Sequence, residues 1–94
     1  MAKLIRTRQA EIDLLEIWAF IAEENTMAAD ELVRKLDARS HQLLEHPNMG
    51  VQRHDIVNGM RHLAVGNYLI LYRIKAGDIE IIRYLHGARD LFSL

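Results

Sequence analysis

The sequence contains no cysteine, a single proline and few aromatic residues, which make up 6% of its 94 positions. Without cysteine, neither a disulfide framework nor a thiolate metal site can form, and this absence is consistent with the cytoplasm. The longest apolar run, Ile17 to Ala22, is only six residues and too short to span a membrane. The segment from Met1 to Arg6 is too short and too charged for a signal peptide. We therefore expect a cytoplasmic protein without a membrane span.

The charges lack a dominant sign, because 12 Lys and Arg stand against 13 Asp and Glu and leave a formal net charge of −1. Such a balance gives no global attraction to nucleic acid. Arg53, Arg61 and Arg73 are scattered singly, and no stacking aromatic residues are interleaved with them. We expect no direct binding of nucleic acid by this chain.

Half of the residues are hydrophobic and 27% are charged, an ordinary globular composition, and the length predicts one domain spanning residues 1–94. Apolar residues at helical spacing predict a helix from Gln9 to Glu24, with Thr7 as its N-cap. A second helix is predicted from about Met27 to His46, with Thr26 as its N-cap. So short a link between two helices predicts an antiparallel helical hairpin.

Short alternating segments predict one strand at residues 3–6 and three more near residues 60–65, 68–75 and 78–86. The last three are joined by two-residue links, Gly66-Asn67 and Ala76-Gly77, which favour tight hairpin turns. The element order is β-α-α-β-β-β. It predicts an α+β fold in which the helical hairpin packs on one face of an antiparallel sheet.

Counting outward from Ala76-Gly77 places Arg73 opposite Glu80 and Leu71 opposite Ile82, a register favoured by the opposite charges of the first pair. One face of the sheet is richer in β-branched and aromatic residues, and we assign it to the helices. It carries Leu63, Val65, Tyr68, Ile70, Tyr72, Ile74, Ile79, Ile81 and Leu85. Arg83 falls on the same face. Three explanations stay open: it snorkels, it pairs with an acidic residue of a helix, or a β-bulge turns it.

The opposite face is also apolar, where a self-sufficient monomer would be polar. It carries Met60, His62, Ala64, Leu69, Leu71, Ile82, Tyr84 and His86. Four of these, Leu69, Leu71, Ile82 and Tyr84, would form one contiguous patch. Exposed apolar residues are common singly, but contiguous patches more often mark a binding site. We therefore predict that the chain is one half of a complex.

Several segments, taken in order, resemble ParE toxins of the RelE/ParE superfamily of bacterial toxin–antitoxin systems. The matching segments are Ile12–Ala22, His46–Gly50, Gly59–Arg61, Tyr68–Arg73 and Leu85–Asp90. The resemblance covers nearly the whole chain. It implies a toxin that inhibits DNA gyrase by protein contact, without catalytic residues or a cofactor.

The resemblance also implies a partner, a ParD-like antitoxin with a ribbon-helix-helix domain and a disordered segment that folds onto the toxin. We expect that segment to contact the helical hairpin and the patch residues Met60, Leu69, Leu71, Ile82 and Tyr84. We expect contact with the target near the C-terminus, through His86, Arg89, Asp90 and Phe92.

The superfamily implies an alternative, a RelE-like ribosome-dependent mRNA endonuclease using His62, Tyr84, His86 and Arg89. Metal-free cleavage of RNA needs groups that move protons and neutralise developing charge. RelE-like nucleases typically place an arginine just after the tyrosine of the middle strand, where this chain has Leu69 after Tyr68. That leucine favours the ParE-like interpretation. A metal site is not predicted, because His62 and His86 lack an acidic partner.

Overall fold

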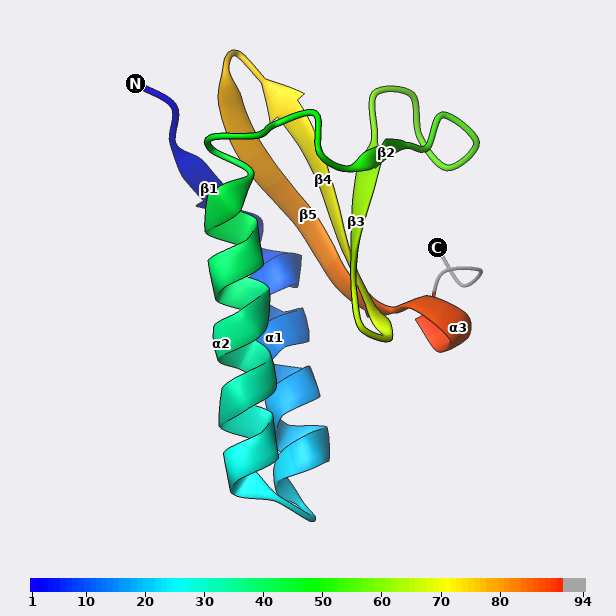
Figure 1. Cartoon of the computed structure of the whole chain (residues 1–94). Coiled ribbons are helices and arrows are strands. Elements are labelled where there is room, and N and C mark those ends of the chain that lie inside the picture. The colour runs from blue at the N-terminus through cyan, green and yellow to red at the C-terminus, as the bar shows by residue number, and fades with distance from the viewer. Residues whose placement is uncertain (91–94) are drawn as a thin grey trace.

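The computed structural model describes residues 1–90, apart from the side chains of residues 88 and 89. Two helices, α1 and α2, lie together on one face of a five-stranded sheet with the strand order β1-β5-β4-β3-β2 (Figure 1). The elements are β1 (Leu4–Arg6), α1 (Arg8–Ala22), α2 (Thr26–Gln42), β2 (Val51–Gln52), β3 (Arg61–Val65), β4 (Tyr68–Lys75), β5 (Asp78–His86) and α3 (Gly87–Asp90).

This arrangement confirms the predicted α+β fold with a helical hairpin on one face of the sheet. The sheet is mixed, however, because β1 pairs in parallel with β5 while the other pairs are antiparallel. The short elements β2 and α3 were not predicted. None of the helices within residues 1–90 is long and apolar enough to cross a membrane.

The helix ends follow local hydrogen-bonding chemistry. The hydroxyl of Thr7 accepts a hydrogen bond from the N–H of Ala10 at 3.1 Å, which confirms Thr7 as the N-cap of α1. The N-cap of α2 is Asn25 and not Thr26, because the Asn25 side chain accepts from the N–H of Ala28 at 3.0 Å. An Asn side chain can reach an early helical amide as well as a threonine hydroxyl can, so two adjacent capping residues competed for one position.

The hairpin between β4 and β5 turns at Ala76-Gly77, where both residues have positive φ, 53° and 84°. This is the backbone of a primed turn, which matches the twist of the strands it joins. The turn sets the predicted register, with Arg73 opposite Glu80 and Tyr72 opposite Ile81.

The register then shifts by one residue, because a β-bulge places Leu71 opposite Arg83 and not opposite Ile82. Since side chains alternate along a strand, an inserted residue moves every later side chain to the other face. Tyr84 therefore lies in the core beneath the helices, and Leu85 lies in a second cluster on the opposite face. The predicted faces of Tyr84, Leu85 and His86 are wrong for this reason.

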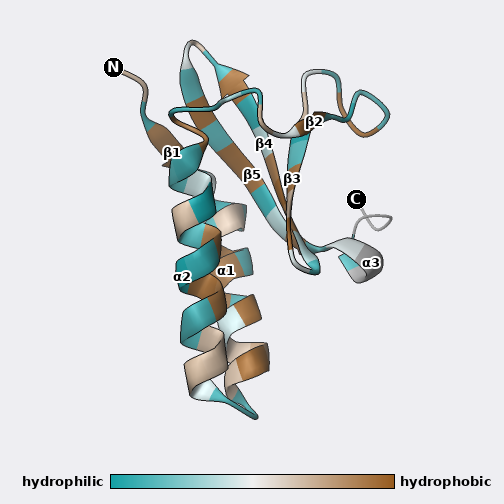
Figure 2. Ribbon diagram, viewed as in Figure 1, coloured by the Kyte–Doolittle hydropathy of each residue, from teal (hydrophilic) through white to brown (hydrophobic). Residues whose placement is uncertain are grey.

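Two hydrophobic clusters result. The main cluster fills the space between the helices and the sheet with buried residues, among them Ile17, Leu36, Leu43, Ile70, Tyr72, Ile79, Ile81 and Tyr84. The smaller cluster, on the other face, contains Met60, Leu71 and Leu85, with Ile56 and Ile82 packed against it. Figure 2 shows the corresponding apolar colouring along β4, β5 and α1.

A buried carboxylate explains the position of Arg83. Asp13 of α1, only 4% exposed, accepts hydrogen bonds from Nε and Nη2 of Arg83 at 2.8 and 3.0 Å. The same carboxylate accepts from the N–H of Tyr84 at 3.1 Å and from the side chain of Gln9 at 3.0 Å. Two of the three explanations for Arg83 are thus confirmed together: it pairs with a helix acid, and it sits at a bulge.

A second polar network holds the other end of Tyr84. Its hydroxyl accepts a hydrogen bond from Nε of Arg6 at 2.9 Å and lies 2.8 Å from Oγ of Ser40. Because Ser40 itself donates to the carbonyl of Leu36, the tyrosine hydroxyl is the donor to Ser40. Arg6 also pairs with Asp37. The hydroxyl of Tyr84 thereby joins β1, β5 and α2.

We predict that replacing Asp13 by alanine lowers the free energy of unfolding by about 3 kcal/mol, because it strands a partly buried guanidinium and an unpaired backbone N–H. Chemical denaturation measures the change. Glu16→Ala is the matched control, since Glu16 is exposed on the same helix, and its effect should stay within about 0.5 kcal/mol. Equal effects of the two variants would contradict this role of Asp13.

Candidate functional site

The predicted patch on the second face of the sheet is largely covered by the chain itself. Met60, Leu71 and Tyr84 are only 7%, 1% and 2% exposed. Tyr84 is buried because the bulge turns it toward the helices. Met60 and Leu71 are buried because the loop between β2 and β3 packs Ile56 on their cluster. These three residues are not the exposed surface that the alternation predicted.

The other two patch residues, Leu69 and Ile82, are half-buried. They remain partly accessible on that face, and whether they contact a partner is still a prediction. The apolar second face therefore serves first as a small internal core, and it needs no partner to cover Leu71 or Met60.

The C-terminal residues predicted to contact a target are only partly described. His86 is half-buried, with its ring against that of Tyr68 in an edge-to-face arrangement at 5.3 Å between centroids. Its N–H donates to the carboxylate of Asp90 at 2.9 Å. The side chain of Arg89 and all of Phe92 lie outside the described residues. Target contact by these four residues remains a prediction.

Three of the four residues of the alternative nuclease mechanism, His62, Tyr84 and His86, do not share one face of the sheet. Beyond the bulge, Tyr84 and His86 both face the helices, where His86 pairs with Tyr68 across the ladder. His62 pairs with Leu71 on the opposite face. Three candidate acid–base groups are thus divided between the two sides of the sheet, so they cannot act together on one phosphate without rearrangement.

His62 is engaged in a local cluster. Its Nδ1 lies 3.2 Å from Nη1 of Arg53, and Arg53 pairs with Asp55 through two hydrogen bonds of 2.9 and 2.8 Å. Burial lowers the pKa of His62, and the positive charge of Arg53 lowers it further against the opposing effect of Asp55. The neutral ring therefore accepts from Arg53 through Nδ1.

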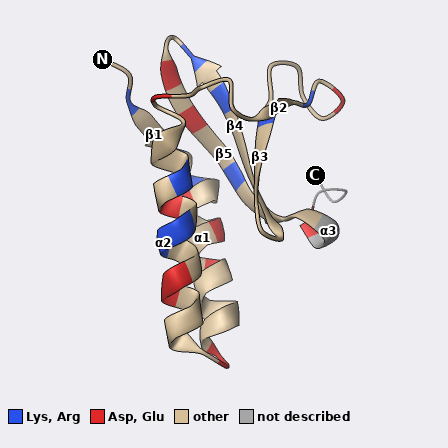
Figure 3. Cartoon of the chain, viewed as in Figure 1, with Lys and Arg blue, Asp and Glu red and all other residues tan. Residues whose placement is uncertain are grey.

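The other scattered arginines also have partners in the chain. Arg73 pairs with Glu80, and Arg61 donates to the carbonyl of Gly50 at 2.7 Å. Both charge signs occur along α2, as Figure 3 shows. Within residues 1–90, no group of three or more histidine or acidic side chains is placed to hold a metal ion.

The largest exposed apolar side chains gather on the helical hairpin, which the resemblance implies as an antitoxin contact together with the sheet patch. Leu15, Phe20 and Met27 are 70%, 61% and 80% exposed, and Trp18 is partly exposed as well. A signal was present: apolar residues occupy more of α1 than the single stripe that packing on a sheet requires. Helices that are apolar beyond one face usually meet a second partner.

Part of this surface forms a groove where α1, α2 and β1 meet, with a volume of about 620 Å³. We call it the hairpin groove. Its lining residues are Leu4, Arg6, Glu11, Leu14, Leu15, Trp18 and Val33. A shallower hollow continues it along α2 and shares Arg6, Leu14, Trp18 and Val33 with it. The Trp18 ring lines both the groove and the hollow, and its Nε1–H donates a hydrogen bond to the carboxylate of Asp30 at 2.7 Å.

Comparison with known proteins places these features in context. A family model described as ParE toxin of type II toxin-antitoxin system, parDE, matches residues 4–91. Toxin ParE3 of Caulobacter vibrioides is 30% identical over 92 residues, covering 97% of this chain and 92% of that protein. Toxin ParE1 of the same organism is 33% identical over 85 residues, covering 89% of this chain and 88% of that protein.

A solved structure shows the same architecture. A chain of the chromosomal ParDE toxin–antitoxin system from P. aeruginosa superimposes with a TM-score of 0.78 at 26% identity. The superposition covers 92% of this chain and 96% of that chain.

The lowered pKa of His62 makes stability depend on pH. Because the unfolded histidine, with a pKa near 6.5, binds a proton more readily than the folded one, stability is full above about pH 6.5 and falls as the pH drops toward the folded pKa. We predict a shallower fall between about pH 7 and 5 in His62→Gln, measured by denaturation at each pH. An unchanged slope would contradict the assignment of His62 as a source of this dependence.

Proposed function

The chain belongs to the ParE toxin family of type II toxin–antitoxin systems, and on that premise we propose that it inhibits DNA gyrase by protein contact and is neutralised by a ParD-like antitoxin. We place this action in the cytoplasm, where gyrase works. The observation that carries the proposal is the exposed apolar surface of the helical hairpin, which a chain acting alone in water would not need.

Action by contact, without catalysis, is supported by the arrangement of the acid–base candidates. Their division between two faces of the sheet leaves no common point for a phosphate. Leu69 follows Tyr68 where RelE-like nucleases carry an arginine, so a neutralising charge is missing at that position. The proposed toxin therefore acts as a binding module.

For the antitoxin we propose the hairpin groove as the main contact. A disordered segment that folds on binding needs apolar pockets to offset its ordering cost. The groove is lined by the half-buried Leu4, Leu14 and Val33 and by the exposed Leu15. The similarity to a solved ParDE system supports an antitoxin partner of this kind. On the sheet, only Leu69 and Ile82 are proposed as additional contacts, since Met60, Leu71 and Tyr84 are buried.

We propose that the target binds the C-terminal end of the chain. His86 and Asp90, which are held by hydrogen bonds, would contact it together with Arg89 and Phe92. Asp90 fixes the start of α3 by accepting from the N–H of His86. A short helix held in this way can present its remaining side chains in a constant orientation, which lowers the entropic cost of binding.

We predict that Leu15→Glu weakens binding of the antitoxin about tenfold or more, because it places a carboxylate in an apolar contact. Isothermal titration with the purified antitoxin measures the affinity. Met27→Glu is the matched control: Met27 is also highly exposed on the hairpin but does not line the groove. Equal losses in the two variants, or none in either, would remove the groove from the proposal.

We predict that the protein inhibits supercoiling by purified gyrase at concentrations on the order of 1 μM, and that Arg89→Ala weakens the inhibition about tenfold. Arg8→Ala, on an exposed arginine at the start of α1, should leave it unchanged. No inhibition by the unaltered protein would rule out gyrase as the target. Cleavage of ribosome-bound mRNA that disappears in His86→Ala would instead establish the RelE-like alternative.

A further inference from the structure

The loop between β2 and β3, residues 53–60, packs on the smaller hydrophobic cluster, on the face of the sheet away from the helices (Figure 1). We call this loop the lid. Ile56, near its middle, lies against the buried side chains of Met60, Leu71 and Leu85. Without this cover, an apolar surface of the sheet would face water.

Backbone hydrogen bonds give the lid its shape. The N–H of Arg53 donates to the carbonyl of Met60 at 2.7 Å, and the N–H of Met60 donates to the carbonyl of Val57 at 3.0 Å. The second bond closes a turn at Asn58-Gly59, where Gly59 has a φ of 84°. Because these bonds lie within the lid, its position over the cluster depends on its side chains.

Two imidazole rings hold the lid as hydrogen-bond acceptors. Nδ1 of His62, on β3, accepts from Nη1 of Arg53 at 3.2 Å. Nδ1 of His54, within the lid, accepts from the N–H of Gly59 at 3.4 Å. The Nε2 of His54 lies 3.2 Å from Oε1 of Gln52 in β2. An imidazole accepts through Nδ1 only when that nitrogen carries no proton, so both rings are neutral, with the proton on Nε2.

The surroundings of His62 oppose its protonation. Burial lowers the pKa of His62, and the charge of Arg53 lowers it further against the opposing effect of Asp55. Asp55 already accepts two hydrogen bonds from Arg53, so the carboxylate that could compensate a charged ring is engaged. The closed lid therefore favours the neutral form of His62.

The neighbouring strands add little charge beside this ring. In the ladder, His62 stands opposite Val51 of β2 and opposite Leu71 of β4, both uncharged. Two residues after Leu71, on the same face by alternation, Arg73 has its charge compensated by Glu80 of β5.

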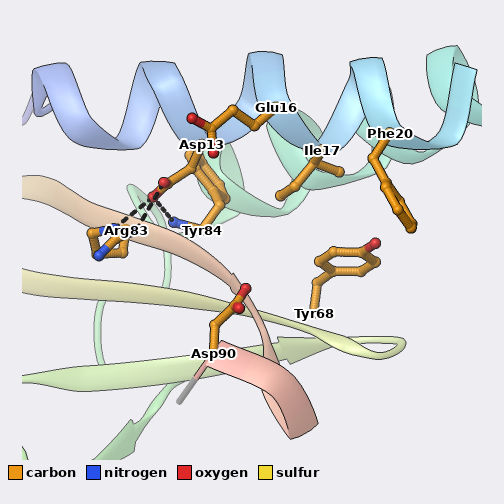
Figure 4. Close-up of a pocket in the computed structure, with 8 residues that line it drawn as sticks. All are labelled: Asp13, Glu16, Ile17, Phe20, Tyr68, Arg83, Tyr84 and Asp90. Atoms are coloured by element: carbon orange, nitrogen blue, oxygen red, sulfur yellow. Dashed lines mark hydrogen bonds and ion pairs between the residues drawn. The ribbon is translucent and has the colours of Figure 1, made fainter. Parts of the chain in front are cut away.

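The charge of Arg83 acts on the other face of the sheet. Arg83 stands opposite Leu71 in the ladder, but its guanidinium donates two hydrogen bonds to Asp13 of α1, as Figure 4 shows. Arg53 and Asp55 are therefore the charged pair through which a proton on His62 acts on the lid.

We propose that the lid opens when His62 and His54 bind protons, and that its opening uncovers the smaller hydrophobic cluster. A proton on Nδ1 turns each ring from an acceptor into a donor, so the hydrogen bonds from Arg53 and Gly59 are lost. At His62 a second positive charge also stands beside the guanidinium. Once the lid has moved, water solvates both charged groups, which offsets part of the cost of exposing the cluster.

The direction of the pH effect follows from the two states of the lid. In the open state the imidazole of His62 is in water, with a pKa near about 6.5, above its pKa under the closed lid. The open state therefore binds protons more tightly, and a fall in pH shifts the population toward it. One such histidine at about pH 5.5 raises the ratio of open to closed lid by up to about tenfold. This equilibrium requires neither gyrase nor an antitoxin.

The test is methyl NMR of the whole protein with a neutral, soluble paramagnetic agent, which relaxes methyl groups that water can reach. We expect the relaxation enhancement at the methyls of Leu71 and Leu85 to rise about three- to tenfold between about pH 7.5 and about pH 5.5, as the open fraction increases. The methyls of Ile70 and Ile79, buried in the main cluster, should show no change. No rise at the two leucines, or an equal rise in both clusters, would overturn the proposal.

Variants assign the effect to the lid. The double variant His54→Gln/His62→Gln should abolish the rise, because glutamine carbonyls can accept the same hydrogen bonds and do not titrate. His41→Gln, on an exposed histidine of α2, should leave the rise unchanged. A rise that persists in the double variant would overturn the role of the two histidines. Ile56→Ala, which thins the apolar cover without altering either ring, should raise the enhancement already at about pH 7.5, where His62 is neutral. No increase in that variant would show that the lid does not shield the cluster.

Discussion

The carboxylate of Asp13, buried between α1 and β5, accepts two hydrogen bonds from the guanidinium of Arg83 and one from the N–H of Tyr84. A buried carboxylate is costly unless it is fully hydrogen-bonded, and here every oxygen is used. The interaction joins α1 to the bulge in β5. The Asp13–Arg83 interaction keeps the bulge at this position. The bulge in turn determines which side chains at the end of β5 face the helices and which face away.

The consequences reach every candidate surface. Tyr84 enters the main core, where its hydroxyl ties β1 and α2 to β5. Leu85 turns to the second face and completes the small cluster with Leu71 and Met60. The apolar second face is thereby closed by the chain's own loop. The exposed apolar surface is instead on the helical hairpin.

The elements that depend on local sequence could be predicted. The two helices, four of the five strands, the turn at Ala76-Gly77 and the register as far as Tyr72 opposite Ile81 all follow from spacing and turn residues. A bulge was one of three open explanations for Arg83, and the sequence could not select it, because its stabilising partner, Asp13, lies in another element about seventy residues earlier. One shifted residue then changed the faces of Tyr84, Leu85 and His86. The excess of apolar residues on α1 was visible in the sequence, but the alternation along the strands predicted exposed positions for Met60, Leu71 and Tyr84, which the structure buries.

We propose that a partner binds mainly the helical hairpin, and that the second face of the sheet contributes only through Leu69 and Ile82. Methyl-labelled NMR of the toxin bound to its antitoxin tests it most directly, through intermolecular contacts to leucine, isoleucine and valine methyls. We predict contacts from the antitoxin to Leu14, Leu15 and Val33 of the hairpin groove. Contacts confined to Leu71, Leu85 and Ile82 would contradict it, because the loop that covers those residues would then have to open on binding.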